Sequence, residues 1–208
     1  MSEEITLPKI RRSQRERRES TMAKLVEATI DSLREVGYAA TSVKEVCRRS
    51  GVSHGGLFRH FPSMLDLILA AAEEVARRQI SEFERRFWQA PHEEPSLHAA
   101  MRMLRDACRT PINSVWYELL VAARTDVPLR TALEPTIRRY YHSIRTTASR
   151  LPGIDSIPAE LFETLLFTLV HVFDGESLAR VVLPHPELEE RRMELLVGLI
   201  ELLQQRRA

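Results

Sequence analysis

The sequence predicts an all-α protein with a small N-terminal three-helix domain and a larger helical domain. Leu, Ala, Arg and Glu dominate a chain that holds only 7 glycines, and most of these residues are good helix formers. Apolar residues recur three or four positions apart along most of the chain, and no segment alternates as a strand does. With 44% hydrophobic residues among 208, the chain can build a core without disulfides or metal ions.

The first three helices are expected to be separated by two short turns. The first helix covers 20–36, where an apolar stripe recurs at helical spacing, and Gly37 supplies its stop. The second helix covers 42–50 and begins with a capping box at Ser42, with Thr41 as the alternative cap. A glycine turn follows, and a serine then caps the third helix, which is expected over 53–61.

Longer helices are expected from Pro62 onward. The predicted helix over 63–89 buries a stripe of Leu, Ile, Val and Ala, and two prolines end it. Prolines also lie near the remaining proposed boundaries, where they are tolerated or stop a helix. On this basis, further helices are expected over 96–109, 112–125, 128–150, 158–183 and 186–206.

Positive charge is concentrated near the N-terminus. Residues 9–61 hold twelve Lys or Arg against six Asp or Glu, whereas residues 62–208 hold eighteen against twenty-one. A basic segment beside a mildly acidic body indicates a polyanion partner for the first part, although a solvated charged face has the same composition. Residues 1–19 are expected to form a flexible basic arm, which either contacts nucleic acid or only aids solubility.

Other function classes find little support in the residues. Cys47 and Cys108 give neither a disulfide framework nor a metal pattern. No apolar run reaches the length of a membrane span and the N-terminus has no signal-like apolar region, so we expect a cytoplasmic protein. No catalytic triad, phosphate-binding loop or dinucleotide fingerprint is present. His171 and Asp174 share a helix face at a spacing suited to a metal or a base pair, but no third ligand accompanies them. We therefore expect no enzyme activity, no cofactor and no metal.

The segment from Thr41 to Phe61, TSVKEVCRRSGVSHGGLFRHF, carries the strongest functional signal. Two short helices meet at a glycine turn and polar residues open the second, as in a helix-turn-helix that places its second helix in the DNA major groove. Together with the overlapping EVGYAATSV and with Leu67, the segment resembles the TetR family of bacterial regulators. A weaker likeness continues in the Asp-Gly-bearing stretch over 173–178 and in the Leu-Pro pair at 183–184.

The resemblance implies which residues contact DNA. The family's contact positions fall on Ser42, Lys44, Ser53, His54, Gly55, Gly56, Phe58, Arg59 and His60. Gly56 replaces the family's usual Thr, Phe58 its usual Tyr and Met64 its usual Lys, so contacts are lost and a shallow salt dependence is expected. Base reading then depends mainly on Lys44, His54 and Arg59, and Arg59 is favoured because a guanidinium pairs bidentately with guanine. Leu57 and Phe61 are expected in the core.

The larger domain is expected to bind a small-molecule effector and to form a homodimer. Effector candidates are aromatic, thioether and polar-tipped side chains, namely Met103, Trp116, Tyr117, Tyr141, Phe167 and His171. Interface candidates are apolar residues of the last two helices, namely Phe162, Leu165, Leu169, Val172, Leu196, Leu199 and Leu203. Packing within one chain is the alternative for both sets. The expected domains are the arm over 1–19, the DNA-binding domain over 20–64 and the ligand-binding and dimerisation domain over 65–208.

These features and the resemblance together imply a ligand-responsive transcriptional regulator. A repressor that a small molecule releases from a palindromic operator is the family default, and an activator is the alternative mode. Because three usual contacts are absent, a helical protein–protein interaction module with weakened DNA binding is the alternative class. Effector binding is expected to change the spacing of two recognition helices, with the helix over 63–89 as the connection. The expected partners are double-stranded operator DNA, the effector and a second copy of the chain, and no membrane.

Overall fold

The computed structural model describes residues 13–89 and 96–205, and every regular element in these two ranges is a helix. The prediction of an all-α protein is confirmed. The chain divides into two compact units, residues 1–71 and 72–208. This division falls seven residues after the domain boundary expected between 64 and 65.

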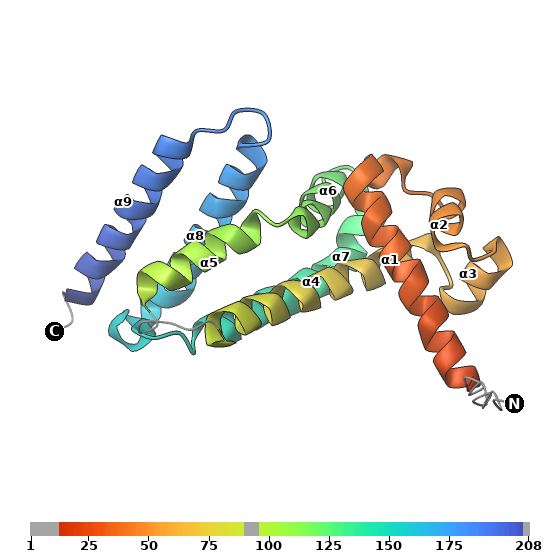
Figure 1. Ribbon diagram of the computed structural model, residues 1–208, viewed down its shortest axis with the longest axis horizontal. Coiled ribbons are helices and arrows are strands. Elements are labelled where there is room, and N and C mark those ends of the chain that lie inside the picture. The colour runs from red at the N-terminus through yellow and green to blue at the C-terminus, as the bar shows by residue number, and fades with distance from the viewer. Residues whose placement is uncertain (1–12, 90–95, 206–208) are drawn as a thin grey trace, which may run out of the picture. The chain divides into compact units, whose positions relative to one another are not determined.

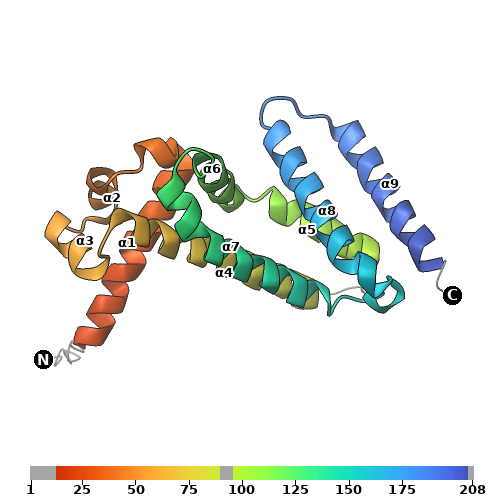
Figure 2. The same cartoon turned by 180° about the vertical axis from the view of Figure 1, so that it is seen from behind.

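The first unit is built from three helices and the first turns of a fourth. Figure 1 shows α2 and α3 side by side against α1, and the reverse view in Figure 2 agrees. Val46 and Leu57 from the two short helices are completely buried with Leu25 and Leu67. This cluster packs α2 and α3 against α1 and the first turn of α4. The helices are α1 (Gln14–Ala40), α2 (Val43–Ser50), α3 (His54–His60) and α4 (Met64–Gln89), the last of which continues into the second unit.

Helix α1 begins six residues earlier than its apolar stripe predicts. Ser13 and Glu16 form a capping box, in which the Glu16 N–H donates to Ser13 Oγ (3.1 Å) and the Ser13 N–H donates to Glu16 Oε2 (2.8 Å). Residues 14–19, which were expected in a flexible arm, are therefore the first turns of a helix. The expectation was wrong for these residues because the cap, and not the start of the apolar stripe, decides where the helix begins. Residues 1–12 of that arm lie outside the described residues.

Gly37 interrupts α1 where the sequence predicts the stop. Its φ of 77° and ψ of 175° lie in a region that is essentially restricted to glycine. The Thr41 hydroxyl donates to the Gly37 carbonyl (2.7 Å) and shares a buried hydrogen bond with Ser32 Oγ (2.9 Å). The break and these two bonds together set the direction in which the chain enters α2.

The second unit is larger and is assembled from long helices. Within it α5 packs against α8 and α9, and both views show α4 beside α7. Helix α8 ends four residues before its predicted end, and the following residues 180–183 form turns. Besides the end of α4, the elements are α5 (Leu97–Cys108), η1 (Pro111–Asn113), α6 (Ser114–Ala122), α7 (Val127–Ala148), η2 (Ile154–Ser156), α8 (Ala159–Ala179) and α9 (Pro186–Gln205), where η denotes a 3-10 helix.

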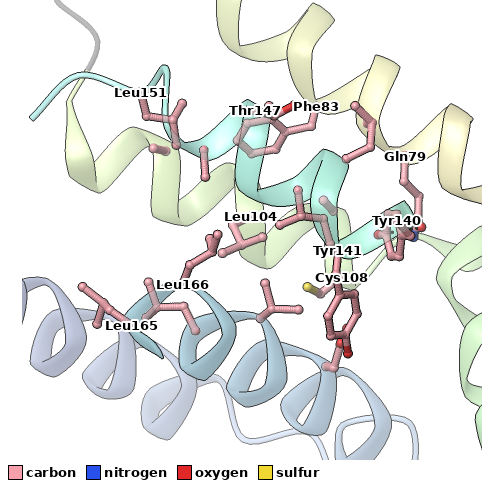
Figure 3. A pocket seen from close by; sticks show the side chains of 18 of the residues that line it. Gln79, Phe83, Leu104, Cys108, Tyr140, Tyr141, Thr147, Leu151, Leu165 and Leu166 are labelled. Carbon is pink, nitrogen blue, oxygen red and sulfur yellow. Dashed lines mark hydrogen bonds between the residues drawn. The ribbon is translucent and has the colours of Figure 1, made fainter. Parts of the chain in front are cut away.

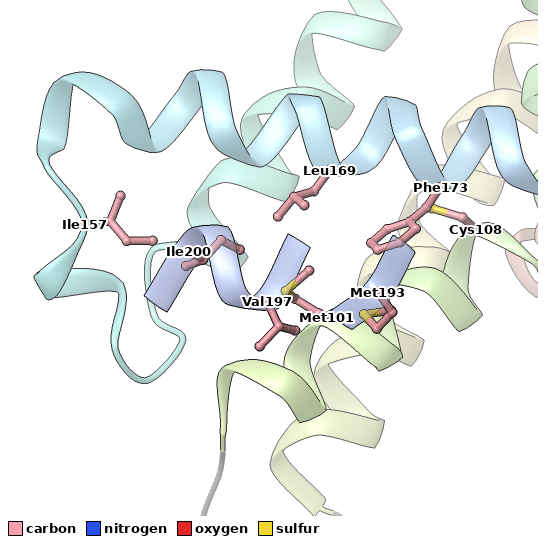
Figure 4. Close-up of a cluster of buried hydrophobic side chains, with 8 residues drawn as sticks. All are labelled: Met101, Cys108, Ile157, Leu169, Phe173, Met193, Val197 and Ile200. Atoms are coloured by element: carbon pink, nitrogen blue, oxygen red, sulfur yellow. The ribbon is translucent and has the colours of Figure 1, made fainter. Parts of the chain in front are cut away.

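A hydrophobic cluster joins α5, α8 and α9. Figure 4 shows Met101 and Cys108 of α5 facing Leu169 and Phe173 of α8, with Met193 of α9 closing the cluster. Each fully buried side chain of this size stabilises the fold by roughly 1.5–3 kcal/mol relative to an exposed one. The cluster therefore holds the last helix against the rest of the unit.

A buried group of charges links the same three helices. Arg109, which follows α5, donates to Glu176 of α8 (2.5 Å) and to Glu189 of α9 (2.7 Å). Arg192 also bonds to Glu176, whose side chain is only 3% exposed. Burial opposes the charged form of Glu189, but a backbone hydrogen bond from His185 and the attraction of Arg109 and Arg180 together outweigh it and lower the pKa of this carboxyl. A carboxylate buried so deeply is tolerated because it is paired.

Candidate functional sites: a helix-turn-helix and an internal cavity

Two serine caps and one glycine shape the turn between α2 and α3. Ser42 Oγ accepts from the Glu45 N–H (3.3 Å), and Ser53 Oγ accepts from the Gly56 N–H (3.2 Å). Gly51 ends α2 in the left-handed conformation (φ 68°) and donates to the Cys47 carbonyl (3.0 Å). The sequence therefore starts both helices with a local bond and turns the chain between them with a glycine.

The outer side of α3 is polar and aromatic. His54, Phe58 and Arg59 are exposed, as is Lys44 of α2, whereas Leu57 and Phe61 are buried as expected. The rings of His54 and Phe58 lie 4.8 Å apart, and Phe58 stays 39% exposed. Both residues are among the expected DNA contacts, and exposed aromatic rings of this kind can contact the methyl group of thymine.

Gly56 lies where the helix touches the turn. A Cβ at this position would come within 2.9 Å of Val52 Cγ1 and 3.1 Å of Ser53 Oγ. A side chain at this position would therefore require Val52 or Ser53 to shift. His60 is half-buried and its buried Nδ1 has no hydrogen-bond partner among the described residues.

The charges around α2 are divided between paired and unpaired cations. Glu45 accepts from Arg48 Nη2 (2.7 Å) and from Arg49 Nε (2.6 Å), and Arg49 also donates to Glu35 (2.7 Å). Hydrogen bonds from Arg48 and Arg49 lower the pKa of Glu45 to about 2. Within the described part of the chain, Lys44 and Arg59 pair with no carboxylate. These two cations remain available to phosphates or base edges.

The second unit contains a cavity of about 140 Å³. Figure 3 shows Leu151, Leu165 and Leu166 at one end and Gln79 and Tyr140 at the other. The walls come from all the long helices of the unit and from both 3-10 turns. The lining comprises Gln79, Ile80, Phe83, Ala100, Leu104, Ala107, Cys108, Asn113, Trp116, Tyr117, Leu120, Ile137, Tyr140, Tyr141, Ile144, Thr147, Ala148, Leu151, Ile154, Ile157, Phe162, Leu165, Leu166, Leu169, Val170, Asp174 and Ile200.

A chain of hydrogen bonds crosses the polar end of the cavity. Gln79 Oε1 accepts from Trp116 Nε1 (2.8 Å) and from the Tyr140 hydroxyl (2.9 Å), and Gln79 Nε2 donates to Asn113 Oδ1 (2.6 Å). Asn113 Nδ2 in turn donates to Asp174 Oδ1 (3.1 Å). The network thus joins four helices and one 3-10 turn through side chains that the fold brings together.

Comparison with known proteins decides the family of this fold. The sequence pattern of the bacterial regulatory proteins of the tetR family matches residues 25–71, which include α2 and α3. An uncharacterised HTH-type transcriptional regulator of Mycobacterium tuberculosis (strain H37Rv) is 44% identical over 189 residues, 91% of this chain and 97% of that protein. This chain belongs to the TetR family. It is a transcriptional regulator whose helix-turn-helix binds DNA.

Solved structures share the fold of this TetR-family chain. A transcriptional regulator from Rhodococcus sp. Rha1 is 28% identical with a TM-score of 0.66, and the match covers 86% of this chain and 95% of that one. The multidrug binding protein EbrR, complexed with imidazole, is 24% identical with a TM-score of 0.59 and coverages of 86% and 93%. The prediction of an N-terminal helix-turn-helix followed by a larger helical domain is confirmed.

The cavity of this chain is lined by three of the six residues expected to bind an effector. Trp116, Tyr117 and Tyr141 line it. Phe167 and His171 lie outside, since the Phe167 ring stacks on that of Tyr141 (4.5 Å) and the exposed His171 bonds to the Tyr141 hydroxyl (3.1 Å). Met103 lines a separate surface hollow with residues of α4. The sequence pattern places these three on the correct helices but does not show that their side chains point away from the cavity.

The sequence did not identify three polar residues of the hydrogen-bond network at the cavity. Gln79, Asn113 and Asp174 were not among the candidates, although Asp174 was noted for its spacing from His171. No local sequence pattern marks these residues, because their partners in the network lie 34 or 61 positions away. His171 and Asp174 do not act as a pair, and among residues 13–89 and 96–205 no three His, Cys, Asp or Glu side chains gather as metal ligands.

Most residues expected at a dimer interface have contacts within their own chain. Leu169 is buried in the cluster of Figure 4, and the same cluster packs against four further candidates, Phe162, Leu165, Val172 and Leu196. Leu203 is half-buried, whereas Leu199 is 49% exposed. The apolar pattern predicted contact correctly but did not distinguish a contact within one chain from a contact between two.

A helix that crosses a membrane must be both long and apolar over most of its length. None of the described helices satisfies both conditions.

Proposed function

We propose that this protein is a homodimeric, cytoplasmic repressor that leaves a palindromic operator when a small molecule occupies its cavity. The observation that carries the proposal is the exposed, unpaired cationic and aromatic surface on α2 and α3, formed by Lys44, His54, Phe58 and Arg59. The caps leave the first N–H groups of α3 at the same end, where they favour a phosphate.

The two cations of this surface, Arg59 and Lys44, have different roles in the proposal. Arg59 reads a base, because a guanidinium pairs bidentately with guanine at about 1–3 kcal/mol of discrimination. Lys44, which the sequence suggested as a base reader, is proposed as a phosphate contact that adds affinity without sequence preference, because it lies in the first turn of α2 and not on the recognition helix α3. Ser42 and Ser53 act through the caps that orient both helices, while Gly55, Gly56 and His60 bring the backbone and the helix end close to the DNA.

Dimerisation is part of the proposal because one recognition helix buries too little surface for tight binding, about 600–1,000 Å² for a single module. A two-fold pair places two such helices one DNA turn apart, about 34–36 Å. The outer faces of α8 and α9 suit this contact, since Leu178, Leu195 and Leu199 are exposed there. Gly175 and Gly198 of these helices have no neighbour within 4 Å of a Cβ position, which leaves room for another helix.

The cavity supplies the effector site in this proposal. Its apolar walls and few convergent polar groups have the composition of small-molecule sites. A filled cavity favours one arrangement of the dimer, and repression is lost when that arrangement spaces the recognition helices wrongly. The fold itself accommodates such molecules, as the imidazole complex of EbrR illustrates for that protein.

An electrophoretic shift with the DNA upstream of the protein's own gene tests the proposal. The wild-type chain should bind this DNA in preference to scrambled DNA, and the preference should weaken as salt is added. Arg59→Ala should lose most of the preference, roughly tenfold or more, whereas Lys44→Ala should weaken both DNAs equally. Arg77→Ala is the matched control, because Arg77 is paired with Glu74 on α4.

Three results would contradict the proposal. Discrimination that survives Arg59→Ala removes that residue as the base reader. Failure of the wild-type protein to shift DNA even at low salt favours the interaction-module alternative, and a reporter that loses expression when the gene is deleted favours the activator.

A further inference from the structure

We propose that the cavity binds a compact apolar amine whose ammonium group lies at Asp174. The proposal rests on the proposed function above and names the class of effector. It follows from the size of the cavity, from the charge of its polar end and from the hydrogen bonds that are already made there.

The size of the cavity restricts the ligand to about one ring. Its volume of about 140 Å³ is close to that of an apolar protein cavity of about 150 Å³ that takes up benzene. The end of the cavity formed by Leu151, Leu165 and Leu166 offers only hydrocarbon, as Figure 3 shows. A ring or a branched hydrocarbon fits this end.

The charge at the other end comes from one carboxylate. Asp174 Oδ1 accepts from the Tyr117 hydroxyl (2.9 Å) and from Asn113 Nδ2 (3.1 Å). Among the described lining residues there is no Lys, Arg or His to balance it. Nearby Arg109 is already bound to Glu176 and Glu189. A carboxylate at the wall of an apolar cavity attracts a cation and repels an anion more strongly than it would in bulk water.

The remaining polar groups at this end bond to one another. Gln79 is occupied by Trp116, Tyr140 and Asn113. Burial and the nearby Asp174 carboxylate raise the pKa of the Cys108 thiol and of the Tyr117 hydroxyl, so both stay protonated and uncharged. A carboxylate can accept about four hydrogen bonds, so Asp174 keeps capacity for a donor of the ligand.

Aromatic rings surround the same position. Trp116 and Tyr140 stack with their ring centroids 5.0 Å apart, and Tyr117, whose hydroxyl bonds to Asp174, and Tyr141 also line the cavity. The faces of such rings attract a cation. An ammonium at Asp174 would therefore gain an ion pair and an aromatic environment, while a carboxylate ligand would gain neither.

Calorimetric titration of the purified full-length protein with three matched probes tests the inference. Benzylamine, benzyl alcohol and benzoate share a ring and differ in charge. We expect benzylamine to bind at least tenfold more tightly than the alcohol, and benzoate to bind most weakly.

Asp174→Asn keeps the shape of the side chain and removes its charge. Benzylamine affinity should fall tenfold or more, while affinity for the alcohol should change by less than threefold. Glu160→Gln, an exposed carboxylate on the same helix, should leave all three affinities unchanged. A general loss of structure would lower all three equally, so the change in ranking distinguishes a ligand contact from a folding defect. If Asp174→Asn does not fold, the ranking of the wild-type protein decides.

The inference is overturned if benzoate binds as well as benzylamine, if no probe binds, or if Asp174→Asn leaves benzylamine affinity unchanged. The operator shift is measured without any ligand. A protein that shifts its operator but shows the wrong ranking therefore retains the proposed function and loses only this assignment.

Discussion

The two units of the chain differ in how far apart in the sequence their hydrogen-bonded side chains lie. In the first unit, Ser53 caps a residue three positions away and Arg49 reaches Glu35 over fourteen positions. In the second unit, Gln79 reaches Asn113 over 34 positions and Arg109 reaches Glu176 over 67. The helix-turn-helix is therefore specified largely by neighbouring residues, whereas the cavity and the charge cluster exist only once the helices have packed. Three substitutions probe this difference.

The largest effect is expected in the second unit. Glu176→Gln removes a charge that is 3% exposed and leaves Arg109 and Arg192 with one partner fewer. Breaking a buried ion pair by removing one partner costs about 3–5 kcal/mol, so the free energy of unfolding should fall by that amount. Urea denaturation at constant protein concentration measures it.

Glu194→Gln is the control for this substitution, since Glu194 is an exposed carboxylate on α9. It should change the free energy of unfolding by less than about 0.5 kcal/mol. If Glu176→Gln costs less than about 1 kcal/mol, the long-range charge cluster is not what holds α9 in place.

An intermediate effect is expected from the backbone of the first unit. Gly37→Ala places a side chain at φ 77° and ψ 175°, which costs about 1–3 kcal/mol. Gly55→Ala is the matched comparison, because this helical glycine has no neighbour within 4 Å of a Cβ position and alanine stabilises helices by about 0.5–1 kcal/mol. Thermal unfolding should therefore move in opposite directions for the two variants. Equal shifts would show that the break at Gly37 is not needed.

The smallest effect concerns the local ion pairs of α2. The pKa of Glu45 is lowered to about 2 in the folded protein by its hydrogen bonds with Arg48 and Arg49. Because the folded-state pKa is depressed, the contribution of this group to stability is present above about pH 4.5 and is lost as the pH falls toward 2. NMR titration of the Glu45 carboxyl carbon should give a midpoint near 2 in the wild-type protein and a higher one in Arg48→Ala. A wild-type midpoint near 4.5 would mean that solvent screens these exposed pairs almost completely.

The same contrast explains what could be predicted from the sequence. The turn, the caps and the buried Leu57 were predictable because a few adjacent residues specify them. The start of α1 was missed because the capping box at Ser13 lies before the first apolar residue of the stripe. Trp116, Tyr117 and Tyr141 were identified as cavity candidates by their chemistry alone.

What the sequence did not provide was the direction of each side chain in the second unit. Helices α8 and α9 are apolar on two faces, so the pattern did not separate Leu169, buried in its own chain, from Leu199, which is exposed. Gln79 and Asp174 each lie in a helix whose local pattern is satisfied without them, and their shared network depends on how α4 and α8 are placed.

Gly56 also has a consequence for protein engineering. Operator specificity is commonly altered by exchanging a recognition helix between relatives, and a donor helix that carries threonine at this position would bring a Cβ within 2.9 Å of Val52 Cγ1. The exchangeable module in this chain is therefore residues 52–60, the end of the turn together with the helix. A chimera that keeps Val52 and Ser53 from this protein should be remodelled at the turn, whereas one that imports both from the donor should retain a well-packed helix.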